Sequence, residues 1–288
     1  MKRVSRAAER TLSTQSLESE SLSADGGDRA ARSTAVNMLS LVEKLASTER
    51  IGVTALARIA GIPVATTYRM LRILEQTGYV EQLETSKEYR LTLKLFSLGC
   101  EVASKTTIRD LAVVELAKLA EQTGMTTNLG VLVGTDLLYL SKVESGDLFT
   151  LNQPPGSRSP ATCTAMGKAM LAFDTRPVAS IVGKGPYVCR TEYSICTLEE
   201  LKKDLTETKR RGYSIDRQEF ALGVYSVGAP ITGGRYGQQG AISVSAVRPG
   251  MRETECRQLG EIVKSVASEI SARIPNGGQL GILGEWIR

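Results

Sequence analysis

The residues of this sequence best suited to recognising a ligand lie within a single segment, Val64–Thr77. Arg69 and Arg72 follow small and hydroxyl-bearing residues there, and the aromatic Tyr68 directly precedes Arg69. Guanidinium groups donate paired hydrogen bonds to phosphates and to guanine edges, and small residues let a helix N-terminus approach the bases of a major groove. The chain between Glu49 and Glu75 contains four arginines and no acidic residue. This segment therefore favours DNA recognition.

The apolar spacing of the same segment fixes which side chains face outward. Thr67, Met70, Leu71 and Leu74 recur at i, i+3, i+4 and i+7, which is the stripe of a helix that packs against a core. The opposite face then presents the predicted DNA-contacting residues of this helix, Ala65, Thr66, Tyr68, Arg69 and Arg72.

The elements around this helix predict a winged helix-turn-helix domain. A helix ending near Ser47 precedes a second helix that Thr54 would cap and Gly61 would end, and Pro63 suits the first position of the next helix. Two β-prone runs, 79–83 and 89–93, then form a hairpin with a polar tip, where Lys87 completes the predicted DNA-binding set. A winged helix that binds a protein through a solvated basic face remains the alternative.

Residue types that are absent or scarce exclude several classes of chemistry. The chain has no histidine, which rules out Ser-His and Cys-His nucleophiles and histidine-containing zinc sites. Its five cysteines are odd in number and lack CxxC spacing, so we expect reduced cytoplasmic thiols. We expect no catalytic residue, no metal, no cofactor and no transmembrane helix. With 42% hydrophobic and 23% charged residues over 288 positions, the chain is typical of a soluble protein with two domains.

The remaining two thirds of the chain alternates helices with antiparallel hairpins, which predicts an α+β sensor-like domain. A helix is expected to open over 160–167, where free backbone N–H groups and the helix dipole favour an anion. Ser226, Ser243 and Ser245 are polar residues on otherwise apolar strands, as expected for the lining of a small polar pocket. The alternative is that Thr162 only caps the helix and the serines bond to neighbouring backbone.

Two roles are considered for each of three further residues. Asp216 either accepts a hydrogen bond from a ligand or holds a loop amide. Lys168 resembles an anion-binding lysine, but a solvated or ion-paired lysine is the more ordinary role on the second turn of a helix. Cys163 has no identifiable basic partner, so a buried small residue is its default role.

Four motifs resemble the isocitrate lyase regulator (IclR) family. The run IPVATTYRML at 62–71, followed by EQTGYV at 75–80, is similar to the family's recognition helix. The other three runs are PGSRSPATCTAMGKAMLA at 155–172, RGYSID at 211–216 and GAISVSA at 240–246. Their order and spacing are those of the family, and the similarity covers about residues 32–273.

Composition predicts a disordered tail over 1–31, and the pattern of elements predicts a winged helix-turn-helix domain over 32–94, a linker helix over 95–107, a further domain over 108–276 and a C-terminal tail over 277–288. The resemblance implies that the first domain binds DNA and that the second is a GAF-like effector-binding domain. It implies a regulator, taken here as a repressor, that binds a double-stranded DNA operator and assembles as a homodimer or a dimer of dimers. The implied effector is a small carboxylate or related metabolite that contacts Leu148, Ala165, Met166, Asp216, Val224 and Ser226.

The sequence departs from the family at several of these positions. The family often has histidine at 162 and cysteine at 226, where this chain has Thr162 and Ser226, and Val64-Ala65 replaces a Lys-Ser pair. Tyr68 stands where a histidine is usual. Two other functions remain open: an enzyme using Asp216 and Lys168 as acid and base, and a DNA-binding protein whose C-terminal domain only dimerises.

Overall fold

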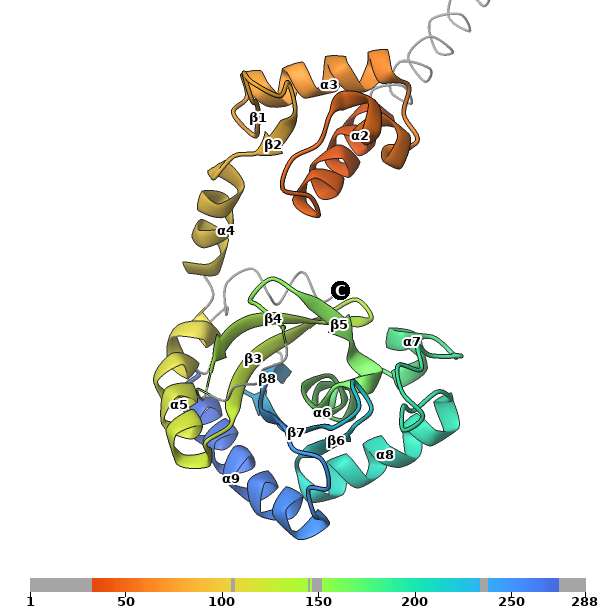
Figure 1. The fold of residues 1–288 in the computed structure, drawn as a ribbon. Coiled ribbons are helices and arrows are strands. Elements are labelled where there is room, and N and C mark those ends of the chain that lie inside the picture. Colours follow the sequence, from red (N-terminus) through yellow and green to blue (C-terminus); the bar gives the residue numbers. More distant parts are fainter. Residues whose placement is uncertain (1–32, 105–106, 145, 147–151, 234–237, 275–288) are drawn as a thin grey trace, which may run out of the picture. The chain divides into compact units, whose positions relative to one another are not determined.

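The computed structural model describes residues 33–104, 107–144, 146, 152–233 and 238–274 (Figure 1). The chain divides into two compact units between Glu101 and Val102, and each has its own core. The α+β fold class predicted from the sequence is confirmed, because helices and antiparallel strands occur in both units.

The N-terminal unit is a winged helix-turn-helix. Its elements are a helix over 33–46, α2 (Val53–Ala60), α3 (Val64–Gln76), β1 (Val80–Gln82) and β2 (Tyr89–Leu91), followed by α4 (Lys94–Ser104), which crosses the boundary between the units. Strands β1 and β2 pair antiparallel, and a core that includes Leu41, Leu56, Leu71 and Tyr89 joins the helices to this hairpin.

The ends of α2 and α3 differ in detail from the sequence-based expectation. Gly61 has the left-handed backbone predicted for the end of α2, with φ of 67°. The residue before α2 is Gly52, so the prediction that Thr54 caps this helix was wrong: the extended backbone ends two residues earlier. Pro63 precedes α3 instead of taking its first position.

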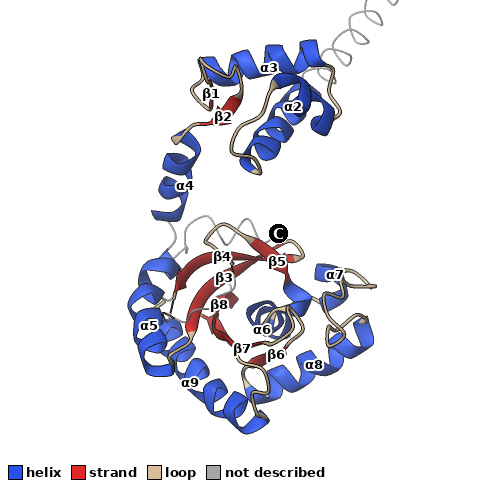
Figure 2. Cartoon of the chain, in the orientation of Figure 1, coloured by secondary structure: helices blue, strands red, loops and turns tan. Residues whose placement is uncertain are grey.

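The C-terminal unit is built on a six-stranded antiparallel sheet in the order β5-β4-β3-β8-β7-β6. The strands are β3 (Thr126–Val133), β4 (Asp136–Val143), β5 (Arg158–Pro160), β6 (Ser214–Arg217), β7 (Val224–Thr232) and β8 (Gln238–Val247). Figure 2 shows that the sheet is strongly curled, with helices on both of its faces.

The helices of this unit form two layers. On the outer face, α5 (Thr107–Thr123) and α9 (Glu253–Ala272) pack on β3, β7 and β8 through one apolar cluster. On the inner face lies α6 (Ala165–Phe173), followed along the chain by α7 (Val178–Val182) and α8 (Leu198–Arg211). The short elements β5 and α7 were not predicted from the sequence.

Gly228 allows α6 to lie directly against the sheet. A Cβ atom at this position of β7 would stand 2.8 Å from the Ala165 carbonyl carbon and 2.9 Å from the Met166 nitrogen. The hydroxyl of Ser214 donates to the Ala165 carbonyl oxygen and ties the same turn to β6. The N-terminal turn of α6 is therefore fixed over β6 and β7.

The cysteines differ from the expectation of five reduced thiols. Cys189 and Cys196 are joined by a disulfide, because the loop before α8 brings their Cα atoms to 5.6 Å, a separation that a disulfide spans. Cys100, Cys163 and Cys256 are free. Among the described helices, none is long and apolar enough to cross a membrane.

Candidate functional site

The first candidate site is the exposed face of α3. Thr67, Met70, Leu71 and Leu74 are buried, as the sequence pattern predicts. The residues predicted to contact DNA lie on the other side: Ala65, Tyr68, Arg69 and Arg72 are exposed, and Thr66 is half-buried. All of these residues lie in the N-terminal unit.

The charge on this face is positive and weakly neutralised. The first turn of α3 contains no acidic residue, so the positive end of the helix dipole is not offset there. Arg72 forms an exposed pair with Glu75 at 3.4 Å, a contact of small free energy in water. Within the described part of the chain, Arg69 has no ion-pair partner, so its guanidinium is available to an external anion.

Lys87 lies at the tip of the β1–β2 hairpin and is exposed. Its backbone has a left-handed φ of 58°, its N–H donates to the Leu83 carbonyl at 2.9 Å, and its own carbonyl accepts from Gln82 Nε2 at 2.9 Å. These bonds hold the tip of the wing in one conformation, with a cation at its end.

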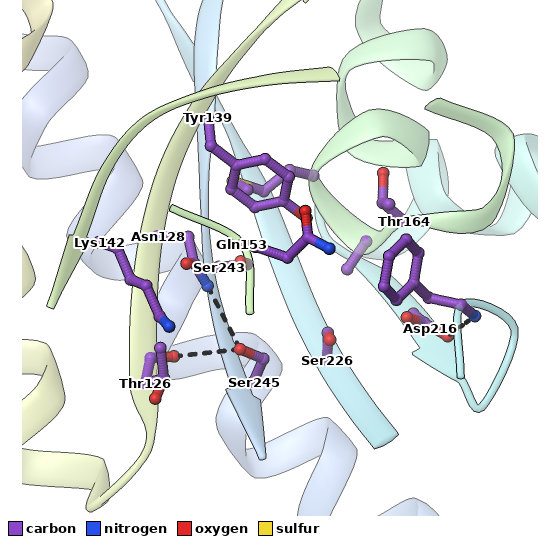
Figure 3. Close-up of a pocket in the computed structure, with 13 residues that line it drawn as sticks. Thr126, Asn128, Tyr139, Lys142, Gln153, Thr164, Asp216, Ser226, Ser243 and Ser245 are labelled. Atoms are coloured by element: carbon purple, nitrogen blue, oxygen red, sulfur yellow. Dashed lines mark hydrogen bonds between the residues drawn. The ribbon is translucent and has the colours of Figure 1, made fainter. Parts of the chain in front are cut away.

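The second candidate site is a polar pocket between the sheet and the N-terminus of α6 (Figure 3). It is narrow, since the centre of a water molecule can reach only about 20 Å³ of it. An organic ligand therefore fits only if side chains of the lining move. The lining consists of Thr126, Asn128, Tyr139, Lys142, Gln153, Thr164, Ala165, Met166, Asp216, Phe220, Ser226, Ser243 and Ser245.

Strand register explains why polar side chains gather here. Ser226 on β7 pairs with Ser245 on β8 and with Asp216 on β6, and Ser245 pairs with Thr126 on β3. Directly paired residues point to the same face of a sheet, so all four line one surface. Asn128 Nδ2 donates to the Ser245 hydroxyl at 3.3 Å, which orients part of this row.

At the N-terminus of α6 the cap is Thr164, whose hydroxyl accepts from the Gly167 N–H at 3.2 Å. The alternative in which Thr162 caps this helix is wrong, because 161–163 forms a separate 3₁₀ turn after β5. Ala165 and Met166 are the first two residues of α6, so their N–H groups have no acceptor within the helix. Both residues line the pocket, where those N–H groups favour an anion.

Asp216 is buried at the edge of the pocket, and the structure shows the second of the two roles considered for it, that of holding loop amides. Its Oδ1 accepts from the backbone N–H groups of Glu219 at 2.7 Å and Phe220 at 3.4 Å, which holds the turn after β6. Burial, reinforced by the neighbouring charge of Glu219, raises the pKa of Asp216 to about 7. The carboxyl group can therefore be protonated or ionised near neutral pH.

Behind Asp216 lies a buried ion cluster centred on Lys168, whose side chain is fully buried. Its Nζ lies 2.6 Å from Glu219 Oε1 and 3.2 Å from Asp204 Oδ2, and it donates to the Ile215 carbonyl at 2.8 Å. Burial lowers the pKa of Lys168, but the two carboxylates outweigh burial and raise it. Lys168 is ion-paired and not solvated, and it does not line the pocket.

The turn that carries Glu219 and Phe220 is held from outside by the disulfide-containing loop. Thr191 Oγ1 donates to the Gln218 carbonyl at 2.7 Å, and Ser194 Oγ donates to the Glu219 carbonyl at 2.7 Å. The Arg190 guanidinium stacks 4.1 Å from the centre of the Phe220 ring. This loop thereby fixes one wall of the pocket.

The pocket contains six of the eight residues expected to contact an effector: Ala165, Met166, Asp216, Ser226, Ser243 and Ser245. Val224 is buried in β7 but does not line the pocket, and Leu148 lies outside the described residues. Cys163 is buried, which raises the pKa of its thiol to about 12 and keeps it protonated. Sequence reasoning missed Thr126, Asn128, Tyr139, Lys142, Gln153 and Phe220; only Thr126 and Asn128, polar residues on an apolar strand, had a visible signal.

Known protein families match the parts of the chain that contain both candidate sites. Residues 32–84 match the IclR helix-turn-helix domain, and residues 100–272 match the bacterial transcriptional regulator IclR C-terminal family. The chain is 31% identical to the glycerol operon regulatory protein of Streptomyces coelicolor, over 79% of this chain and 90% of that protein. It is 29% identical to the acetate operon repressor of Salmonella typhimurium, over 81% of this chain and 86% of that protein.

A solved structure, the IclR protein of Thermotoga maritima, has the same fold. It superposes with a TM-score of 0.69 at 26% identity, covering 84% of this chain and 99% of that one.

Proposed function

This chain belongs to the IclR family of bacterial transcriptional regulators, and we propose that it represses a catabolic operon until a small organic acid occupies its polar pocket. The observation that supports DNA binding most directly is the exposed basic face of α3. The names of the two relatives, an operon regulator and an operon repressor, support the repressor role.

In this proposal α3 enters the major groove. Ala65 and Thr66 at its N-terminal end allow close approach, while Tyr68, Arg69 and Arg72 contact base edges and phosphates. Lys87 at the wing tip contacts the backbone of the neighbouring groove. Such contacts need access to the chromosome, so we place the protein in the cytoplasm.

We propose that the regulator acts as a homodimer or a dimer of dimers, because paired recognition helices read two half-sites. Two apolar side chains, one just before α4 and one in its first turn, support this, since Leu93 is 81% exposed and Phe96 is 70% exposed. Exposure of such large apolar side chains to water is unfavourable in a monomer, and contact with a second copy of the chain would bury them.

The proposed effector is inferred from the hydrogen-bonding groups that line the pocket. A carboxylate would accept from the Ala165 and Met166 N–H groups, with Asp216, Ser226, Ser243 and Ser245 completing the polar contacts and Val224 packing behind them. Because the pocket is narrow, an effector would displace side chains around α6, and such a displacement can be transmitted to the DNA-binding unit. Leu148 remains a prediction.

We further propose that the pocket binds its ligand without converting it. An acid-base role would need Lys168 beside Asp216 in the pocket, whereas the amino group of Lys168 is engaged by Glu219, Asp204 and a backbone carbonyl. Turnover of an organic acid by the purified protein would contradict this part of the proposal.

The DNA-binding role is tested by Arg69→Ala. Fluorescence anisotropy with the DNA upstream of the protein's own gene should show binding weakened by about 1–3 kcal/mol, as expected for a guanidinium that reads a base. Arg210→Ala on α8 is the matched control, since Arg210 is also exposed and lies in the other unit. Unchanged affinity in Arg69→Ala would refute the assigned role of α3.

A further inference from the structure

The polar pocket has a second charged end, formed by Lys142 on β4. The side chain of Lys142 is only 10% exposed and lines the pocket. Figure 3 shows it extending from β4 toward Thr126 and Ser245. Its Nζ lies 2.8 Å from Glu144 Oε1, but the Glu144 side chain is 59% exposed. A largely buried ammonium is thus paired with a carboxylate that water reaches easily.

Strand register places this ammonium away from the N-terminus of α6. Lys142 pairs with Asn128 on β3, Asn128 with Ser243 on β8, and Ser243 with Gly228 on β7, where α6 rests on the sheet. Three strand spacings of about 4.8 Å separate the two ends along a flat sheet, and the curl of this sheet shortens that span. The four-carbon stem of Lys142 covers part of it, so the distance that remains between the ammonium and α6 matches a ligand a few carbon atoms long, which fits once lining side chains move.

The groups between the two ends are neutral hydrogen-bonding side chains. Thr126, Asn128, Ser226, Ser243 and Ser245 line this stretch of the pocket. They can bond to hydroxyl or carbonyl oxygens of a ligand, but they carry no charge that would balance a cation or an anion. The charged groups of a ligand are therefore directed to the two ends.

We propose that Lys142 is a specificity-determining residue that makes the pocket select a dicarboxylate. One carboxylate accepts from the N–H groups at the start of α6, and the second replaces Glu144 as the partner of Lys142. Inside the pocket the attraction between Lys142 and a ligand carboxylate is screened less by water than its attraction to the exposed Glu144, and hydrogen bonds from the neutral lining side chains offset the cost of removing the ligand carboxylate from water. This inference rests on the proposed function, because it assigns the chemical class of the effector to the same pocket.

The test compares acids of equal chain length on the full-length protein. Isothermal titration measures succinate, glutarate and adipate against butyrate, pentanoate and hexanoate. The best dicarboxylate should bind about tenfold or more tightly than its monocarboxylate counterpart. Lys142→Met should abolish that preference by weakening only the dicarboxylate, whereas Lys142→Arg should keep it.

Two further variants distinguish an effect of the Lys142–Glu144 pair from a general effect of changing a charged residue. Glu144→Gln removes the competing carboxylate, so dicarboxylate binding should become tighter, and unchanged or weaker binding would contradict the replacement of Glu144 by the ligand. Lys118→Met is the control, because Lys118 is an exposed lysine on α5, outside the pocket lining. It should bind every acid as the wild type does.

Two results would overturn the inference, and they differ in what they say of the proposed function. If both kinds of acid bind equally and Lys142→Met changes neither, the selection of dicarboxylates is wrong while an organic-acid effector stands. If no acid of either series binds, the inference fails together with the organic-acid part of the proposed function.

Discussion

The two units use charged side chains in opposite ways. On α3, Arg69 and Arg72 are exposed, and the nearest acidic neighbour forms only a weak pair with one of them. In the C-terminal unit, Lys168 is fully buried and engages two carboxylates and a carbonyl. A cation left in water can bind an external anion, whereas a cation satisfied inside the fold contributes to structure. The pocket lies between these limits, since Asp216 is buried, the Lys142 side chain is 10% exposed, and both line the cavity.

The largest expected effect comes from breaking the buried cluster. Lys168→Met removes the cation but keeps most of the side-chain volume, and it leaves Glu219 buried without its partner. Loss of one member of a buried ion pair costs about 3–5 kcal/mol, so urea unfolding of the C-terminal unit should occur at a much lower midpoint.

Surface and buried pairs can be compared in the same assay. Lys118→Met removes the exposed pair with Glu115 and should change the free energy of unfolding by less than about 1 kcal/mol. Equal effects of the two substitutions would show that the buried cluster has no special structural role.

A smaller effect is expected at the contact between α6 and the sheet. Gly228→Ala places a Cβ atom against the backbone of Ala165 and Met166, which cannot move as a flexible side chain would. Overpacking of this kind costs about 1–3 kcal/mol, and it shifts the N–H groups assigned to the ligand. Acid binding measured by calorimetry should be lost while circular dichroism at low temperature stays native. Retained wild-type affinity would show that the start of α6 is not part of the binding site.

The last expected effect concerns pH. The pKa of Asp216 is about 7 in the folded protein and near 3.8 in an unfolded chain, so the folded state holds an extra proton between these values. Stability from this group is therefore present at low pH and is lost as pH rises through about 7. Asp216→Asn removes this dependence, and its melting temperature relative to wild type should be higher at pH 8 than at pH 5.

The control for the pH experiment is Asp110→Asn, at an exposed position in the first turn of α5. Its melting temperature relative to wild type should not change with pH in the same direction. A constant difference for Asp216→Asn across this range would contradict the raised pKa.

The sequence predicts those features of the two sites that depend on residues close together in the chain. The face of α3 follows from the period of Thr67, Met70, Leu71 and Leu74, because a helix is a local structure whose exposed side is set by its buried side. The serines of β7 and β8 were visible as polar residues in apolar strands.

The remaining features depend on contacts distant in sequence. Lys168 meets Glu219 across 51 residues, so nothing near either residue signals their pairing. Lys142 reaches the pocket through the register of three strands, and it looks like an ordinary polar residue of an alternating strand. The cap at Thr164 could not be separated from Thr162 because the intervening 3₁₀ turn has no distinct sequence signal.

We propose that occupation of the pocket controls the DNA-binding face. The most direct measurement is the affinity of the full-length protein for the DNA upstream of its own gene, with and without a saturating concentration of the acid that binds most tightly. We predict that the acid lowers the DNA affinity of the wild type and has no effect on Gly228→Ala. An acid that binds the wild-type pocket and leaves its DNA affinity unchanged would contradict the account.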